Sequence, residues 1–132
     1  MAGTIVSDTI QNGAGTSTST TNVINGCAKA WVTVNGTLSS SMTLASYGVS
    51  SVTYISSCLY QVSFSTAFTD ANYSSAVSSS WDSGGNSYPM IANIANNGTY
   101  APSTTSTYIV SRVYNNGSTG FLVNYLYAIF FR

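Results

Sequence analysis

A side-chain period of two, repeated along the chain between turn residues, constrains the fold more than any other feature of this sequence. Residues 28–35 place Ala28, Ala30, Val32 and Val34 on one face and Lys29, Trp31, Thr33 and Asn35 on the other. Residues 59–66 alternate in the same way, with Tyr60, Val62 and Phe64 facing inward. Successive side chains of a strand point to opposite faces, so both segments are predicted to be strands with one buried face.

Turn residues separate about eight short strands of this kind. Asn35-Gly36 predicts a turn with positive φ, Pro89 to Ile94 an edge strand that begins at proline, and Asn115-Asn116-Gly117 a hairpin between the last two strands. The 132 residues include ten tyrosines and no glutamate, a bias toward strand formers. We therefore expect an all-β chain: a single antiparallel β-sandwich, jelly-roll-like, with a short extended N-terminal arm.

The final strand, from Gly120 to Arg132, is apolar on both faces. A sheet with one wet face should alternate apolar with polar residues, but Asn124 is the one polar interruption before Arg132. The second face must therefore be covered, by another part of the domain or by a neighbouring subunit. One face carries Phe121, Val123, Tyr125, Tyr127, Ile129 and Phe131; the other carries Ala128 and the assembly candidates Leu122, Leu126 and Phe130.

The shortage of charge excludes one class of function and favours another. Only 5% of residues are charged, against about 25% in ordinary soluble domains, and three basic residues balance three acidic ones. A nucleic-acid binder needs clustered Lys and Arg, so nucleic acid is not an expected partner. The longest apolar run is too short for a membrane helix. A chain with so little charge is better suited to an assembly than to life as a monomer.

Residues 1–26 differ from the sandwich domain predicted for residues 27–132. They contain a Ser/Thr tract, Thr16 to Thr21, which cannot bury enough apolar surface to order itself. Two interpretations stay open: a flexible leader, or a docking or oligomerisation arm that orders against a partner through Ile5, Val6 and Ile10. The N-terminus has no basic segment followed by an apolar one, so no secretory signal is expected.

Catalytic chemistry has little material here. The acids are Asp8, Asp70 and Asp82, and the loop residues Asp70 and Asp82 are more simply explained as stabilising their own turns. Without histidine, neither a Ser-His-Asp triad nor the usual zinc site can be assembled. Cytosolic synthesis argues against a bridge between Cys27 and Cys58. We expect a protein that is not an enzyme and has no cofactor or metal.

A binding role has better material in the loops. Tyr73, Trp81, Tyr88 and Tyr100 lie in or beside polar segments that carry Asn, Ser and Asp. Aromatic faces beside amides and hydroxyls suit sugars, and the same mixture serves adaptable protein-binding surfaces. The alternative is that these rings pack back onto the ends of the sandwich.

One stretch of the sequence resembles a motif of bacteriophage tail-fibre and related virion proteins. The resemblance covers roughly residues 27–75, and the leader from Thr4 to Ile10 also looks like the segment that precedes such domains in phage fibres. The motif reads Lys29-Ala30-Trp31-Val32-Thr33-Val34-Asn35-Gly36-Thr37, then Val49-Ser50-Ser51-Val52, then Tyr60, Val62 and Phe64, then Asp70-Ala71-Asn72-Tyr73.

The resemblance implies a non-enzymatic virion protein made in the host cytoplasm. It would be a homotrimeric tail-fibre, tail-tip or head-fibre component whose N-terminal arm contacts other virion proteins and whose sandwich contributes to particle assembly or host attachment. A host surface glycan or receptor is a further expected partner. Two alternatives are a carbohydrate-binding, lectin-like module and a capsid decoration protein.

Overall fold

The computed structural model describes residues 7–20, 23, 26–38, 42–56, 58–80, 90–113 and 122–132. This part of the chain is almost entirely β, with a short connection of helical conformation at Thr20, Val23 and Gly26. Ten strands are described: β1 (Thr9–Gln11), β2 (Ser17–Ser19), β3 (Ala28–Asn35), β4 (Thr43–Tyr47), β5 (Val49–Ser56), β6 (Leu59–Phe64), β7 (Ser74–Ser79), β8 (Met90–Ile94), β9 (Ser106–Val113) and β10 (Tyr125–Phe131).

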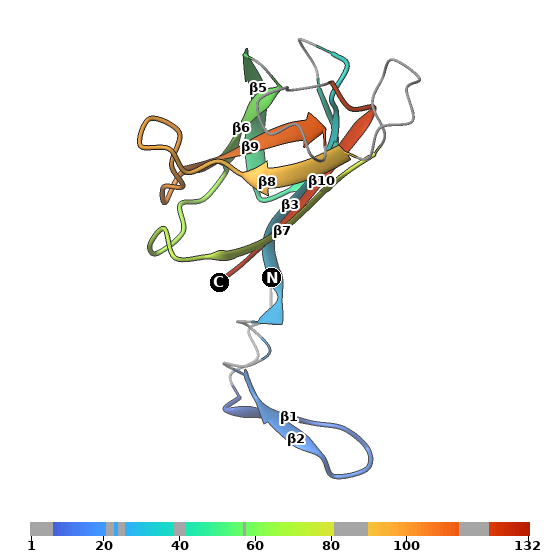
Figure 1. Cartoon of the computed structure of the whole chain (residues 1–132). Helices are drawn as coiled ribbons and strands as arrows, with labels where there is room; N and C mark the ends of the chain where they lie inside the picture. Colours follow the sequence, from blue (N-terminus) through green and yellow to red (C-terminus); the bar gives the residue numbers. More distant parts are fainter. Residues whose placement is uncertain are drawn as a thin grey trace.

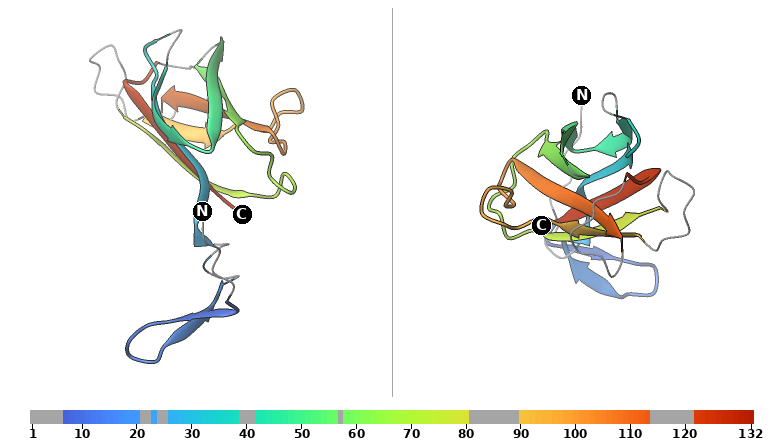
Figure 2. Two further views of the ribbon diagram at one scale, coloured as in Figure 1. Left: turned by 180° about the vertical axis from the view of Figure 1, so that it is seen from behind. Right: turned by 45° about the horizontal axis from the view of Figure 1, so that its top comes forward.

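Eight of these strands form two antiparallel four-stranded sheets, with strand orders β4-β3-β10-β7 and β5-β6-β9-β8. The two sheets face each other across the core, as the strand arrows in Figures 1 and 2 show. The last strand, β10, lies between the first sandwich strand, β3, and β7. The prediction of an all-β antiparallel sandwich is confirmed.

Local pairing follows the turn signals in part. Strands β5 and β6 pair as a hairpin, and β8 lies at a sheet edge as its proline predicted. The predicted hairpin between the last two strands is wrong, because β9 pairs with β6 and β8 whereas β10 pairs with β3 and β7. An Asn-Gly signal favours a turn locally but does not select which sheet the next strand joins.

The core consists of the inner faces of both sheets. Tyr60 and Val62 of β6 are fully buried, as their alternation predicted, and Phe64 is 7% exposed. At one end of the sandwich an aromatic cluster closes the core, with ring centroids of Phe64 and Phe68 4.6 Å apart and those of Phe64 and Phe130 5.1 Å apart. The remaining buried apolar side chains come mainly from β3, β9 and β10: Ala30, Val32, Val34, Ile109, Val110, Val123, Leu126 and Ala128.

The final strand shows which of its two apolar faces turns inward. Leu126 and Phe130 are fully buried, so they are core residues and their prediction as assembly contacts is wrong. The physical reason is register: Leu126 lies opposite Val34 and Phe130 opposite Ala30, both on the inner face of β3. Val123, predicted to share a face with Tyr125, is also buried, because the chain bends at Asn124 and changes its alternation there.

Two glycines are required for different reasons. Gly48 alone joins β4 to β5 across the two sheets; its φ is 67°, and an added Cβ would lie 2.4 Å from the Lys29 carbonyl oxygen. Gly36 does not have the positive φ predicted for the Asn-Gly turn. It is glycine because other backbone packs closely against it, so that an added Cβ would lie 2.4 Å from the Val123 carbonyl oxygen.

The N-terminal arm contains a hairpin rather than an extended segment alone. Strands β1 and β2 pair with Ile10 opposite Thr18, and the turn between them is held by Asn12, whose Oδ1 accepts hydrogen bonds from the Ala14 and Thr16 amides. The Ser/Thr tract supplies β2, an order that its composition did not predict. Ile5 and Val6 lie outside the described residues. In Figures 1 and 2 this hairpin stands clear of the sandwich.

Candidate functional site: an exposed aromatic sheet face

The outer face of the β4-β3-β10-β7 sheet gathers large apolar side chains from three neighbouring strands. Trp31 of β3 lies opposite Tyr47 of β4 on one side and opposite Ile129 of β10 on the other. Tyr127 and Tyr125 follow Ile129 at intervals of two along β10, so they share its face. We call these five residues the aromatic face.

All five side chains reach the surface. Their exposed fractions run from 38% for Trp31 to 62% for Tyr47. Since a large aromatic side chain can bury 150–250 Å², the five expose roughly 400 Å² at these fractions. That is comparable to the largest apolar patch of a typical monomer, about 300–600 Å², and such patches are often functional. It is also about half of what one partner contributes to a standard interface, about 800 Å².

The strand neighbours of the aromatic face are small or carry hydroxyl groups. Ala76 lies opposite Ile129 and Ser78 opposite Tyr127 on β7, while Thr33 lies opposite Ala45 of β4. None of these cross-strand neighbours is charged; the charged residue of the outward row is Lys29, two residues before Trp31 on β3. An exposed apolar surface of this kind gains free energy by being covered. The centres of protein–protein interfaces are likewise rich in Tyr and Trp and poor in charged residues.

A groove lies beside the aromatic face, at the end of the sandwich nearest the arm. It has a volume of about 1100 Å³ and shares Tyr47 with the aromatic face. Two of the three basic residues of the chain, Lys29 and Arg132, line it together with Phe68 and Phe131. We call it the base groove; its other lining residues are Gly48, Ser65, Thr66, Ala67, Thr69, Asn72 and Ser74.

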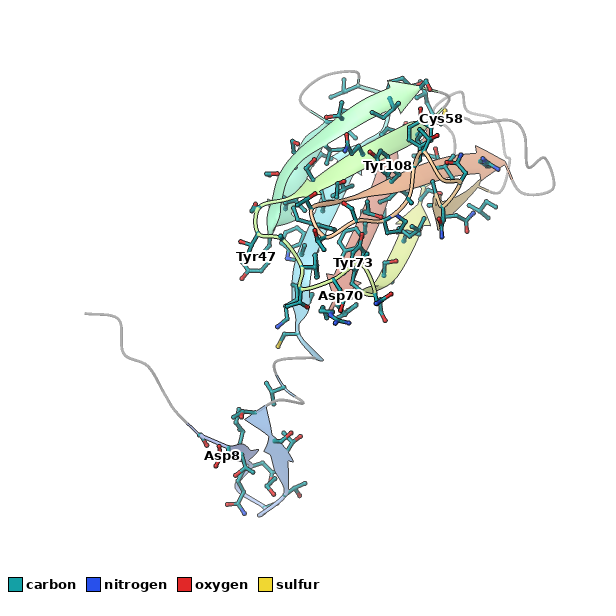
Figure 3. The ribbon with its side chains drawn as sticks, turned by 90° about the vertical axis from the view of Figure 1, so that its left-hand side faces the viewer. Asp8, Tyr47, Cys58, Asp70, Tyr73 and Tyr108 are labelled. Carbon is teal, nitrogen blue, oxygen red and sulfur yellow. The ribbon has the colours of Figure 1, made fainter. Side chains whose placement is uncertain are left out.

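Asp70 has a structural role at the rim of this groove. Its Oδ1 accepts a hydrogen bond from the Asn72 amide at 2.7 Å, which is the turn-stabilising role predicted from the sequence. Its Oδ2 forms an ion pair with Arg132, whose Nη1 also donates to the Asn72 carbonyl at 3.2 Å. Asp8 lies on the arm, and Asp82 lies outside the described residues, so an Asp70–Asp82 pair cannot be placed. Figure 3 shows Asp70 and Asp8 well apart.

The predicted ligand-binding aromatics do not form one site in the described part of the chain. Tyr73 packs against Phe64, Phe68 and Phe130, so its ring closes the core, and burial raises the pKa of its hydroxyl. Tyr100 lies over Tyr108 on the outer face of the other sheet, with ring centroids 5.3 Å apart. Trp81 and Tyr88 lie outside the described residues.

The predicted assembly contacts outside the core are dispersed. Ile10 on the arm is 51% exposed and Leu122, before β10, is 38% exposed. The sequence placed Trp31 in the outward row of residues 28–35 but did not single out Trp31 or Tyr47 as site residues. The available signal was the outward row of residues 28–35 together with the aromatic row of residues 121–131, but only strand register places the two rows side by side.

Among the described residues, no three His, Cys, Asp or Glu side chains gather as they would around a metal ion. Both cysteines are free: Cys27 is exposed, and Cys58 is buried, which raises the pKa of its thiol. No described helix has the length and apolar character needed to cross a membrane.

Comparisons of the chain with protein-family models, with curated proteins and with solved structures found no match.

Proposed function

We propose that this chain is a non-enzymatic structural protein of a bacteriophage virion, a homotrimeric tail-fibre, tail-tip or head-fibre component attached to the particle through its N-terminal arm. The observation that carries the self-association is the exposed aromatic face. The resemblance of residues 27–75 to phage fibre proteins supports the virion assignment.

The partner favoured for the aromatic face is another copy of the chain. A chain of zero formal net charge has little electrostatic protection against self-association, and its 5% charged residues leave few groups to keep copies apart. If copies bury the aromatic face together with its neighbours, the area buried on each partner approaches the roughly 800 Å² of a standard interface. Most soluble homo-oligomers close by rotational symmetry, and in a ring of three each copy uses two different patches, one toward each neighbour.

Two matched variants test the self-association. Ile129→Glu places a carboxylate on the aromatic face, where burying it without a partner costs several kcal/mol. Ile91→Glu makes the same change on the other sheet at nearly the same exposure, 38% against 40%. Light scattering of the wild type should give three times the 13.8 kDa chain mass. Ile129→Glu should raise the dissociation constant at least about tenfold, and Ile91→Glu should not.

A monomeric wild type at working concentration would overturn the self-association. So would equal effects of the two variants, because the aromatic face would then have no special part in assembly.

The virion assignment has a separate test. Purified particles of the phage that encodes the chain should contain it in a copy number divisible by three, and a particle map should place it in a fibre or tail tip. Its absence from particles would refute the assignment, and density spread over the shell lattice would instead make it a decoration protein.

A further inference from the structure

Within the part of the chain that the structure describes, the strands of the β1–β2 hairpin bury little of their surface. Five of its six strand residues are exposed and the sixth, Ser19, is half-buried. An isolated two-stranded hairpin is at best marginally stable in water, since it has no apolar face to bury. Packing on a partner surface would therefore stabilise it.

The base groove has the chemistry to receive this hairpin. Residues 1–26 carry one charged side chain, Asp8, and it is acidic. The groove is lined by Lys29 and Arg132, and with Asp70 at its rim the side-chain charge of this end of the sandwich is net positive. Exposed ion pairs contribute little free energy each, so the charges select the orientation more than they supply the affinity.

Apolar contact adds to the match. Ile10, at the middle of β1, is 51% exposed, and the groove presents Phe68, Phe131 and Ala67. Figure 3 shows Tyr47 and Asp70 at the end of the sandwich nearest the hairpin, which carries Asp8. The groove also borders the aromatic face through Tyr47, so a copy seated on that face lies next to it.

We infer that the β1–β2 hairpin of one copy occupies the base groove of a neighbouring copy, with Asp8 toward Lys29 and Ile10 toward Phe131. This inference rests on the proposed self-association. The eight residues from Thr20 to Cys27 span about 12 Å as a helix and up to about 28 Å when extended. The arm can therefore cross from one base to the next, and in Figures 1 and 2 its hairpin stands clear of the sandwich of its own chain.

Cross-linking tests the exchange directly. In a Cys27→Ser background, which removes the exposed native thiol, Ile10→Cys is combined with Ala67→Cys in the groove. Mild oxidation should convert most of the protein into covalently linked copies. The control pair, Ile10→Cys with Ile91→Cys, places the second thiol on the other sheet and should cross-link at least about tenfold less.

Each other outcome overturns the inference. A bridge within one chain means that the arm folds back onto its own groove, and no bridge means that the groove is not its site. Equal yields from both pairs mean unspecific contact. Failure here is separable from failure of the proposed function: wild-type trimers that Ile129→Glu dissociates, but whose thiols do not cross-link, retain the aromatic face and reject only the arm exchange.

Charge reversal supplies a second readout. Asp8→Lys should lower the hydrogen-exchange protection of the hairpin amides in the assembled protein by about fivefold to tenfold, the effect of turning one attractive pair into a repulsive one. A mixture of Asp8→Lys chains and Lys29→Asp chains should recover protection in up to two of the three arm–groove contacts of a trimer, because oppositely altered arms and grooves then meet in different copies. Arg112→Asp, on the other sheet, is the matched control for Lys29→Asp. Unchanged protection in Asp8→Lys would contradict the inference.

Discussion

Tyr60 links the two sheets through a single side chain. It is fully buried in β6, and its hydroxyl donates a 3.0 Å hydrogen bond to the carbonyl oxygen of Gly36, at the end of β3 in the other sheet. Burial raises the pKa of Tyr60 to about 12, with smaller contributions from Cys58 and Tyr54 nearby. The side chain therefore stays neutral in the folded protein at a pH where it ionises in the unfolded chain.

This shift predicts an alkaline loss of stability specific to Tyr60. Between pH 10 and 12 the native state keeps a proton that the unfolded state has lost, so raising the pH favours unfolding by about 1.4 kcal/mol per pH unit. Below pH 10 the contribution is fully present. Tyr60→Phe removes the hydrogen bond and should lower the free energy of unfolding by about 1–2 kcal/mol at neutral pH. Its free energy of unfolding should not show the additional fall with rising pH that Tyr60 causes.

The measurement is urea unfolding of both proteins from about pH 8 to 12, in the Ile129→Glu background to keep them monomeric. Tyr73 is present in both, so its own raised pKa cancels in the comparison. Equal slopes in the two proteins would show that Tyr60 is not the group responsible.

At the level of elements, β10 decides how the molecule presents itself. Both of its faces are apolar, and pairing with β3 turns Leu126, Ala128 and Phe130 inward. The same register leaves Tyr125 and Tyr127 more than 40% exposed. A strand with one solvent-facing side would ordinarily carry polar residues on that side. The exposed aromatic residues of β10 are therefore the basis of the proposed interface.

The two faces of β10 should respond oppositely to truncation. In the monomeric background, Leu126→Ala should cost about 2–5 kcal/mol of unfolding free energy because it leaves a cavity in the core. Tyr125→Ala should cost under about 1 kcal/mol there, but in the wild-type background it should weaken self-association. Urea unfolding and light scattering together measure both effects. A larger stability loss for Tyr125→Ala than for Leu126→Ala would contradict the observed register.

At the level of the whole molecule, the described surface divides into regions of different chemistry. The aromatic face has no charged member, whereas the base groove beside it contains Lys29 and Arg132. The opposite sheet carries Gln61 and Tyr108 on its outer face, joined by a 3.1 Å hydrogen bond. Self-association and arm docking should therefore depend on different solution conditions.

Salt should separate these two contributions. Because the aromatic face is uncharged, the trimer dissociation constant of a chain lacking residues 1–19 should change less than about twofold between roughly 0.05 and 0.5 M NaCl. Ammonium sulfate should tighten it, since excluded salts strengthen apolar burial. In the full chain, protection of the hairpin amides should fall over the same NaCl range. Strong NaCl dependence of the truncated chain would indicate a charged interface instead.

Much of the fold was predictable because alternation and turn chemistry are local. The buried rows of β3 and β6, the edge position of β8 and the turn role of Asp70 all followed from residues close in sequence. The pairing of β9 and β10, the conformation of Gly36 and the order of the Ser/Thr tract did not follow. Each of these depends on partners far along the chain or, for β2, on pairing with β1.

By itself the sequence determined that the chain is all-β, nearly uncharged, and apolar on both faces of its last strand. A period of two and a residue composition suffice for these conclusions. Only the tertiary structure decided that Leu126 and Phe130 turn into the core while Tyr125, Tyr127 and Ile129 join Trp31 and Tyr47 outside. The physical reason is that the local sequence of the strand does not distinguish its two apolar faces. Only the register with β3 decides which of them packs into the core.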